Sequence, residues 1–301
     1  MKQLTILPSI TLATSSLLLV ACGGGGSSSV RPSSPFTSWS AITPPQTVEV
    51  KGLSAESTYS APAPDYLVTS LGATRESETT SAKLSYDADG ILTRVSITTP
   101  YSTVVWDTSR GDLIEVDSGV ILLGNSTETA LGLAVDPVEL GWDYQTFGAW
   151  ITGFETGSGR AGAFTIGAPT AGNRVPVNGS ATFEGLALGT YVDSGGEAYS
   201  TAGLMSVDAN FLSRQLDFST SDTAKINLNT LVESDANNLD LSGTLNYELG
   251  NNVFSGNVQG TGLDGTAKGQ FYGPDAEEIG GYFNLRGAGI EAYRGAFGGS
   301  R

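Results

Sequence analysis

The second half of the chain alternates apolar and polar residues with a period of two over most of its length. Met205, Val207, Ala209 and Phe211, for example, alternate with polar neighbours. This period places apolar side chains on one face of a β-strand and polar side chains on the other. The pattern recurs over residues 226–229, 239–247, 254–260, 265–271, 279–285 and 293–299. No stretch sustains a 3.6-residue apolar repeat, so the sequence predicts an all-β protein.

Glycines share the apolar face with aromatic residues in these segments, as in Phe254, Gly256, Val258 and Gly260. A small closed barrel needs this mixture, because its tapering interior cannot hold a large side chain at every inward position. We therefore expect a small eight-stranded antiparallel up-and-down β-barrel over residues 171–301, filled with side chains. A two-sheet sandwich stays open as the alternative, since periodicity alone does not report closure.

The first half carries shorter runs of the same kind, over residues 47–170. Pro and Ser dominate the stretch from Val30 to Pro45, which indicates an extended linker before the folded part. The remaining chain is long enough for two domains with their own cores. The predicted strands cover residues 47–51, 84–86, 92–98, 104–106, 113–116, 120–123, 146–152 and 163–166.

The N-terminus has the order of a bacterial export signal. Lys2 precedes an apolar run that Pro8 and several hydroxyl residues interrupt, so it is too broken for a stable membrane span. The run ends at residues 19–22 in Leu-Val-Ala-Cys, which matches the bacterial lipobox. We predict that residues 1–21 are a lipoprotein signal peptide and that Cys22 is the lipid attachment site; an ordinary secretory signal with an incidental cysteine is the alternative.

Acylation of Cys22 would anchor the protein to a membrane without a spanning segment. Residues 22–46 are rich in Gly, Ser and Pro and are expected to form a flexible tether that holds the folded part away from the lipid. Position 23 is Gly rather than Asp, and an Asp there would favour retention at the inner membrane. The predicted location is therefore the outer membrane.

Composition excludes several classes of function. The chain has 31 acidic and 15 basic residues, a formal net charge of −16, which repels nucleic acid and anionic lipid. It has no histidine, so Ser-His-Asp and Cys-His catalysis, histidine metal sites and the common axial ligand of haem are excluded, although haem capture could still use tyrosine. Cys22 is the only cysteine, so no disulfide can form within the chain. We expect no enzyme activity, no cofactor, no metal site and no nucleic-acid partner.

Three short motifs resemble functional sites but have simpler explanations. Asp-Ala-Asp-Gly at 87–90 could suggest a calcium loop, yet it lacks the further ligands and fits a hairpin turn. Residues 260–265 match Gly-x-Gly-x-x-Gly but lie between two predicted strands with no following helix. Glu277 and Glu278 could suggest glycoside hydrolysis, but neighbours on a strand point to opposite faces.

The last 33 residues carry an unusual ordered set of motifs. A Phe-Tyr-Gly-Pro turn is followed by Ala-Glu-Glu-Ile-Gly-Gly and by a final strand ending in Phe-Gly-Gly-Ser-Arg. This order resembles the terminal signature of the transferrin-binding protein B barrel domain, from which only Ser300 departs, because the family has a basic residue there. We interpret the signature as structural. Its residues are Phe271, Tyr272, Gly273, Pro274, Glu278, Gly280, Gly281, Phe283, Phe297, Gly298, Gly299 and Arg301.

The resemblance implies an N-terminal β-rich handle domain at residues 47–170 followed by the barrel domain at 171–301. Residues 144–150 look like the segment that ends the handle in single-lobe members of this family. Full transferrin-binding lipoproteins have two such lobes, whereas this chain has room for one. In the family, ligand contacts come chiefly from loops at the ends of handle and barrel, so the ligand-binding residues cannot be carried over.

The resemblance also implies a surface-exposed outer-membrane lipoprotein that binds a protein ligand and catalyses nothing. The expected ligand carries iron or haem. The expected partners are a surface lipoprotein assembly modulator for export and, beside some family members, a TonB-dependent outer-membrane receptor. A host-protein recruiter or adhesin of the factor H-binding type, with no role in iron, is the alternative.

Overall fold

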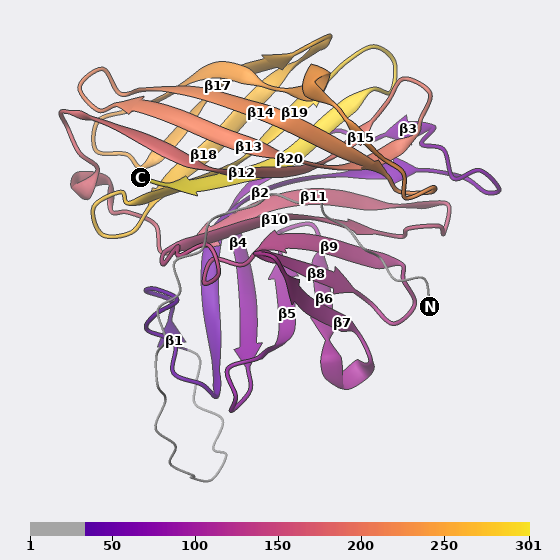
Figure 1. Ribbon diagram of the computed structural model, residues 1–301, viewed down its shortest axis with the longest axis horizontal. Helices are drawn as coiled ribbons and strands as arrows, with labels where there is room; N and C mark the ends of the chain where they lie inside the picture. Colours follow the sequence, from indigo (N-terminus) through magenta and orange to yellow (C-terminus); the bar gives the residue numbers. More distant parts are fainter. Residues whose placement is uncertain (1–33) are drawn as a thin grey trace.

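The computed structural model describes residues 34–301, and almost all of its regular structure is β-strand (Figure 1). The predicted signal peptide, the acylation site Cys22 and residues 22–33 of the predicted tether lie outside the described residues. The strands form two sheets, one over residues 34–167 and the other over residues 180–300. The prediction of an all-β fold is confirmed.

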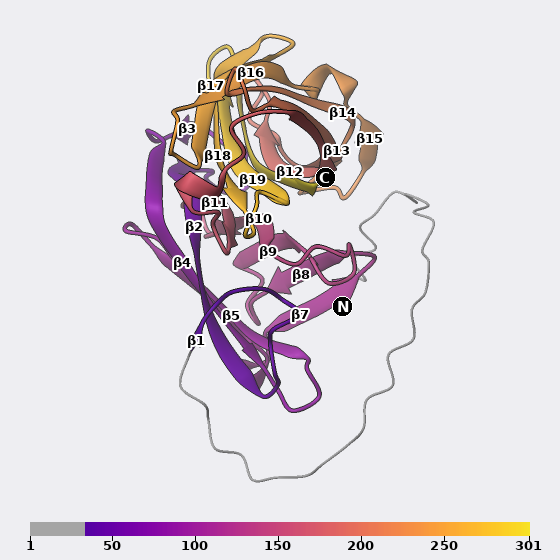
Figure 2. The same ribbon diagram turned by 90° about the vertical axis from the view of Figure 1, so that its left-hand side faces the viewer.

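The second sheet closes into a barrel of eight strands. The strands follow one another around it in chain order, each antiparallel to the next, and β20 pairs with β12 to close it. Figure 2 views this barrel nearly end-on. Closure confirms the up-and-down barrel and excludes the sandwich. The strands are β12 (Ser180–Val192), β13 (Ala198–Asn210), β14 (Gln215–Asn227), β16 (Ser242–Tyr247), β17 (Val253–Gly260), β18 (Leu263–Tyr272), β19 (Glu278–Arg286) and β20 (Ala292–Ser300), with β15 (Glu233–Asp235) paired to β14 outside the circuit.

Aromatic rings inside the barrel lie over glycines of the neighbouring strand. Phe297 is paired with Gly281, and Phe283 with Gly295. A β-carbon at Gly281 would lie 2.5 Å from Cζ of Phe297, closer than any real contact allows. The shared face of glycines and aromatics in the sequence thus reflects rings that fill the space left by missing side chains.

The first sheet, the handle, has eleven strands in the main order β6-β5-β4-β2-β11-β10-β9-β8-β7, with β1 and β3 paired to β2. The last strand of the handle therefore returns to the middle of the sheet beside β2. The strands are β1 (Ser34–Pro35), β2 (Gln46–Ser60), β3 (Ser70–Leu71), β4 (Arg75–Tyr86), β5 (Leu92–Thr98), β6 (Thr103–Asp107), β7 (Leu113–Asp117), β8 (Val120–Gly124), β9 (Ala130–Val135), β10 (Gln145–Thr152) and β11 (Ser158–Gly167). Three 3₁₀ turns, η1 (Thr108–Arg110), η2 (Gly172–Arg174) and η3 (Asn237–Leu239), complete the regular structure of the described residues.

The handle curls around its own core, as Figure 2 shows. Trp106 of β6 is fully buried and donates its indole N–H to the carbonyl of Ala130 in β9 over 3.1 Å, although these strands are not neighbours in the sheet. Val50, Ile97 and Phe164 are buried in the same core. The curl brings side chains from both arms of the sheet together.

The other face of the handle packs on the outside of the barrel. Leu53 and Ala55 of β2 point toward the barrel, whereas Val50 points into the handle core. The barrel contributes Tyr282 of β19 and Ala296 of β20, which are buried in the same cluster. The handle and barrel thus share an apolar interface, and β2 is buried on both faces.

Candidate functional site

Glu278 of the C-terminal signature binds the backbone of the handle. This side chain, 3% exposed, leaves β19 and reaches the start of β10. Its carboxyl oxygens accept the backbone N–H groups of Asp143 (2.6 Å), Tyr144 (3.1 Å) and Gln145 (2.9 Å). One side chain of the barrel therefore satisfies three successive donors of the handle, which fixes the two sheets relative to each other.

The environment of Glu278 disfavours its charge. The pKa of Glu278 is raised to about 7, chiefly by burial and also by the nearby carboxylate of Asp143, although the three backbone donors act to lower it. No ion pair among the described residues includes Glu278. The carboxyl group is thus held by backbone donors rather than by a cation, and burial dominates its titration.

Tyr272 forms a second contact between the domains. Its side chain is completely buried, and its hydroxyl is hydrogen-bonded to that of Thr165 in β11 over 2.8 Å. The ring lies against Gly167 of the handle and Gly280 of the barrel, where a β-carbon would lie 2.7 Å and 3.2 Å from ring atoms. Both glycines leave space for this ring between the sheets.

The turn after β18 joins the barrel to the segment that follows the handle. Gly273 has a φ of +87°, a conformation that favours glycine, and its N–H donates to the carbonyl of Ala168 over 2.9 Å. Its carbonyl accepts the hydroxyl of Thr170 over 2.7 Å. Pro274 follows in the turn, and Arg301 donates to the carbonyl of Asp275 over 3.0 Å, so the C-terminus also closes on this turn.

The two Gly-Gly pairs of the signature serve both faces of the barrel wall. Gly281 lies inside under Phe297, whereas Gly280 faces the handle. A β-carbon at Gly298 would lie 2.6 Å from the ring of Phe147 in the handle, and one at Gly299 would lie 2.8 Å from Met205 inside the barrel. Adjacent glycines therefore allow close packing on opposite sides of one strand.

Phe271, Phe283 and Phe297, the remaining aromatic residues of the signature, fill the barrel. All three are fully buried. Phe271 makes edge contacts with Tyr247 and Phe254, both with ring centroids 5.3 Å apart. The structure thus brings part of the signature to the junction and part to the barrel core, and none of these three side chains is available to a ligand.

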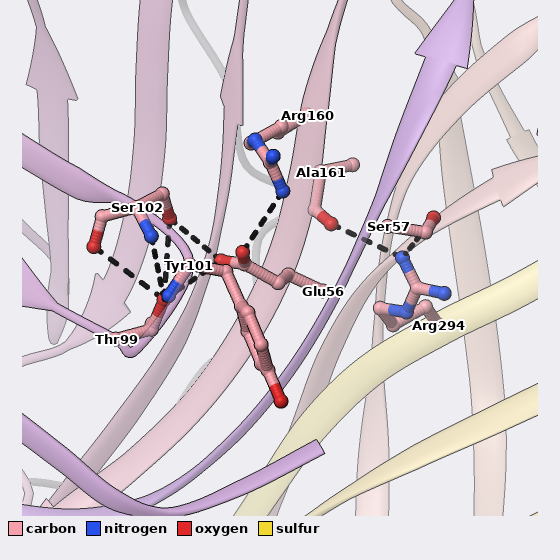
Figure 3. A network of polar contacts seen from close by, with 8 residues as sticks. All are labelled: Glu56, Ser57, Thr99, Tyr101, Ser102, Arg160, Ala161 and Arg294. Atoms are coloured by element: carbon pink, nitrogen blue, oxygen red, sulfur yellow. Dashed lines mark hydrogen bonds and ion pairs between the residues drawn. The ribbon is translucent and has the colours of Figure 1, made fainter. Parts of the chain in front are cut away.

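Arg294, which the sequence analysis did not single out, crosses the same junction (Figure 3). This side chain of β20 donates to the hydroxyl of Ser57 (2.7 Å) and the carbonyl of Ala161 (3.1 Å) in the handle. Desolvation lowers the pKa of Arg294 to about 10, and none of the ion pairs described for residues 34–301 includes it. Its partners in the handle lie more than 130 positions away, so no local sequence signal could have identified these contacts.

Glu56, the neighbour of Ser57, holds the opposite face of β2 (Figure 3). It is 1% exposed and pairs with Arg160 over 3.1 Å. The hydroxyls of Thr99 and Ser102 donate to it over 3.1 Å and 2.6 Å, which fixes the turn between β5 and β6. Glu56 thus fixes a turn of the handle on one face of β2, and its neighbour Ser57 contacts the barrel on the other face.

Three exposed aliphatic side chains lie on connections at the end of the barrel near the C-terminus. Val177, Leu212 and Leu249 are 58%, 71% and 69% exposed, and each lies on a different connection. These connections touch, because Phe211 donates its N–H to the carbonyl of Gly179 over 3.0 Å and residues 248–252 approach residues 170–172. We call Val177, Leu212 and Leu249 the barrel-end patch. The sequence analysis missed it because exposed aliphatic residues in turns carry no periodic signal.

A buried polar group lies in the strand that leads to this patch. Tyr247, at the end of β16, is 7% exposed, and its hydroxyl has no hydrogen-bond partner among the described residues. Burial raises its pKa.

The short motifs lie in turns. The carboxylate of Asp87 accepts the N–H groups of Asp89 and Ile91, both over 2.9 Å, within the hairpin between β4 and β5. Gly262, with a φ of +73°, forms the turn between β17 and β18. Residues 34–301 contain no cluster of three or more Cys, Asp or Glu residues that could hold a metal ion. In the same residues, no helix has the length and apolar character needed to cross a membrane.

Sequence comparison relates the barrel to transferrin-binding proteins. Residues 175–301 match the family model described as the C-lobe and N-lobe beta barrels of Tf-binding protein B. Transferrin-binding protein B of Haemophilus influenzae strain KW20 / Rd is 30% identical over an alignment of 140 residues that covers 41% of this chain and 22% of that protein. The protein of strain 86-028NP is 28% identical over an alignment of 144 residues that covers 43% of this chain and 22% of that protein. The chain thus spans about a fifth of the length of these curated relatives.

Solved structures of similar proteins share little sequence with this chain. A mutant of transferrin binding protein B from Haemophilus parasuis gives a TM-score of 0.47 at 14% identity, covering 73% of this chain and 51% of that chain. The haemoglobin receptor HpuA from Kingella denitrificans, in complex with human haemoglobin, gives a TM-score of 0.39 at 16% identity, covering 90% of this chain and 94% of that chain.

The family model covers every strand of the closed barrel, from the segment that leads into β12 to the last residue of β20. The same residues contain the Phe-Tyr-Gly-Pro turn and both Gly-Gly pairs. Residues 175–301 of this chain therefore belong to the family of transferrin-binding protein B barrels.

Proposed function

We propose that this protein is a non-catalytic receptor on the bacterial surface, anchored at Cys22 in the outer membrane, that captures a protein carrying iron or haem. The curated relatives that match part of this chain are named for binding transferrin. The lipobox and the Gly/Ser/Pro-rich residues 22–46 support an anchor and a tether. The absence of histidine from the sequence supports binding rather than catalysis.

The barrel-end patch is the observation that carries the proposal. Three contiguous connections present aliphatic side chains to water, whereas the barrel interior is filled and the junction is sealed. Full burial of one Val or Leu side chain stabilises a complex by roughly 1.5–3 kcal/mol. Burial of three such side chains in an interface would favour binding of a partner with an apolar surface.

The contacts between the two sheets also favour a rigid receptor. Glu278, Tyr272 and Arg294 hold the handle and barrel together through buried hydrogen bonds. A surface that is already ordered loses little conformational entropy on binding. We therefore propose that the ligand docks on the barrel end without a large rearrangement of the two sheets. We also propose that a surface lipoprotein assembly modulator exports the protein and that a TonB-dependent receptor lies beside it in the outer membrane.

A pull-down tests this function. The protein without its signal peptide and acylated cysteine (residues 23–301) is immobilised and exposed to serum and to erythrocyte lysate, and retained proteins are identified by mass spectrometry. One variant replaces each residue of the barrel-end patch with serine. A matched control replaces three aliphatic residues of the second sheet that lie outside the patch, Leu204, Leu231 and Val232, which are 40%, 42% and 63% exposed.

The expected result is an iron- or haem-carrying protein retained by the wild type and the control and lost in the patch variant. Retention of a host protein without iron or haem would replace the iron assignment with the recruiter or adhesin function. If neither fluid yields a retained protein, or if the patch and control variants behave alike, the receptor function or its assignment to this patch is wrong.

A further inference from the structure

The handle contains an apolar cavity of about 320 Å³ that is separate from the barrel-end patch. Its buried floor includes Trp39, Phe164 and Ile166. Its walls come from the β4–β5 hairpin on one side and from β8 and the segment after β9 on the other. The volume is at the lower end of the range for small-molecule sites, and the lining is predominantly apolar, as in such sites.

The cavity opens to solvent between exposed aliphatic side chains. Ile91, Val116 and Val138 line it and are 60%, 47% and 71% exposed. They come from three separate places, the turn after β4, the end of β7 and the segment after β9. A packed core would cover these side chains, so an apolar rim around an apolar hollow indicates a site with room for a further apolar group.

The ionisable residues that line the cavity are Tyr86 and Asp136. Burial raises the pKa of Asp136, and the neighbouring Glu139 also raises it. Burial and the charge of Asp136 raise the pKa of Tyr86. The carboxylate of Asp136 accepts the N–H of Val138 over 3.0 Å, and none of the ion pairs formed by residues 34–301 includes it.

We propose that this cavity binds a small, mainly apolar molecule that carries one hydrogen-bond-donating head group, an ammonium or a hydroxyl, placed against Asp136. A half-buried carboxylate without a cation is stabilised by a donor and most strongly by a positive one. A carboxylate head group would face a like charge in an apolar surrounding and is excluded on that ground. This site is independent of the protein ligand proposed above.

A fluorescent probe tests the site. 1-Aminoanthracene has an apolar body with a single amine and changes its emission in apolar surroundings, so it is titrated into the protein of residues 23–301. Three competitors with the same ten-carbon tail, decylamine, decanol and decanoate, are then used to displace it. We expect saturable binding at one site and displacement by decylamine and decanol. Displacement by decanoate should be weaker by about tenfold or more, because its carboxylate donates no hydrogen bond to Asp136 and faces a like charge.

Variants locate the site and assign the head group. Asp136→Asn keeps the shape of the side chain and a hydrogen-bond acceptor but removes the charge. The affinity for decylamine should therefore fall by about tenfold, while the affinity for decanol should change little. Val138→Lys places a charge at the exposed rim of the cavity, where folding tolerates it. This variant should bind the probe more weakly than the wild type does. Val232→Lys, at an exposed aliphatic residue outside both the cavity and the barrel-end patch, is the matched control and should leave probe binding unchanged.

Three results would overturn the proposal. The first is no saturable binding of the probe. The second is binding that Val138→Lys and Asp136→Asn leave unchanged. The third is displacement by decanoate as strong as by decylamine. Loss of protein capture in Val138→Lys, without probe binding in the wild type, would instead assign the cavity to a side chain of the protein ligand. Failure of the pull-down alone would leave this site standing, because its readout uses no protein ligand.

Discussion

Replacing Glu278 with glutamine should flatten the pH dependence of stability. Burial raises the pKa of Glu278 from 4.5 to about 7, so the folded protein binds this proton more tightly than the unfolded chain does. The stabilising contribution of the protonated group is therefore fully present below about pH 4.5 and is lost as the pH rises to about 7. At about 1.4 kcal/mol for each pKa unit, the loss amounts to about 3 kcal/mol. A glutamine side chain has no proton to lose in this range, so its contribution is constant.

The assay is urea unfolding at intervals between about pH 4.5 and 8 for the wild type, Glu278→Gln and Glu277→Gln. The free energy of unfolding of Glu278→Gln, measured relative to the wild type, should rise by about 3 kcal/mol over this range. For Glu277→Gln, which changes the adjacent carboxylate, the free energy of unfolding should change with pH in parallel with that of the wild type. Parallel curves for Glu278→Gln and the wild type would refute the assignment of a raised pKa to this contact.

The other predictions concern the barrel and the anchor. Gly281→Ala should lower the free energy of unfolding by about 1–3 kcal/mol in a thermal melt, because its β-carbon would meet Phe297 and the backbone of β18. Gly124→Ala should be tolerated in the same melt, because no atom would lie closer than 3.8 Å to its β-carbon. Phe271→Ala should cost about 3–5 kcal/mol in chemical unfolding by emptying the aromatic cluster, and a loss below about 1 kcal/mol would contradict its central place. Cys22→Ala should abolish incorporation of labelled palmitate, and undiminished label would exclude acylation at this position.

Sequence periodicity predicts strands that are buried on one face and fails for strands that are buried on both. Residues such as Val207 and Phe254 alternate with polar residues and lie inside the barrel, as expected. β12 was missed, because Phe183 faces the barrel core while Leu186 and Leu188 pack toward the handle. With apolar residues on both faces, the period-two signal disappears.

Buried polar residues also prevented the sequence from predicting the second half of β2. Only five residues of β2 were predicted as strand, because Ser54, Glu56 and Ser57 give its second half the composition of a loop. In the structure all three are buried and hydrogen-bonded. A sequence shows that such residues are polar but not that partners more than 20 positions away will satisfy them.

The close packing around the glycines of the signature could be expected from the sequence, but the contacts of its residues could not. Glycine and aromatic residues in a barrel strand indicate close packing from composition alone. That Glu278 reaches residues 143–145 depends on the docking of the two sheets, which no local pattern encodes. The division into domains at residues 170 and 171 and the role of Cys22 stay predictions.

The most direct test of the proposed receptor is hydrogen–deuterium exchange with and without the captured protein. The barrel-end patch lies on the connections at residues 172–179, 211–214 and 248–252. We predict that bound ligand slows amide exchange in these three connections and leaves the handle turn at 87–91 unchanged. Protection confined to the handle, or no protection of the three connections in a saturated complex, would contradict docking at the barrel end.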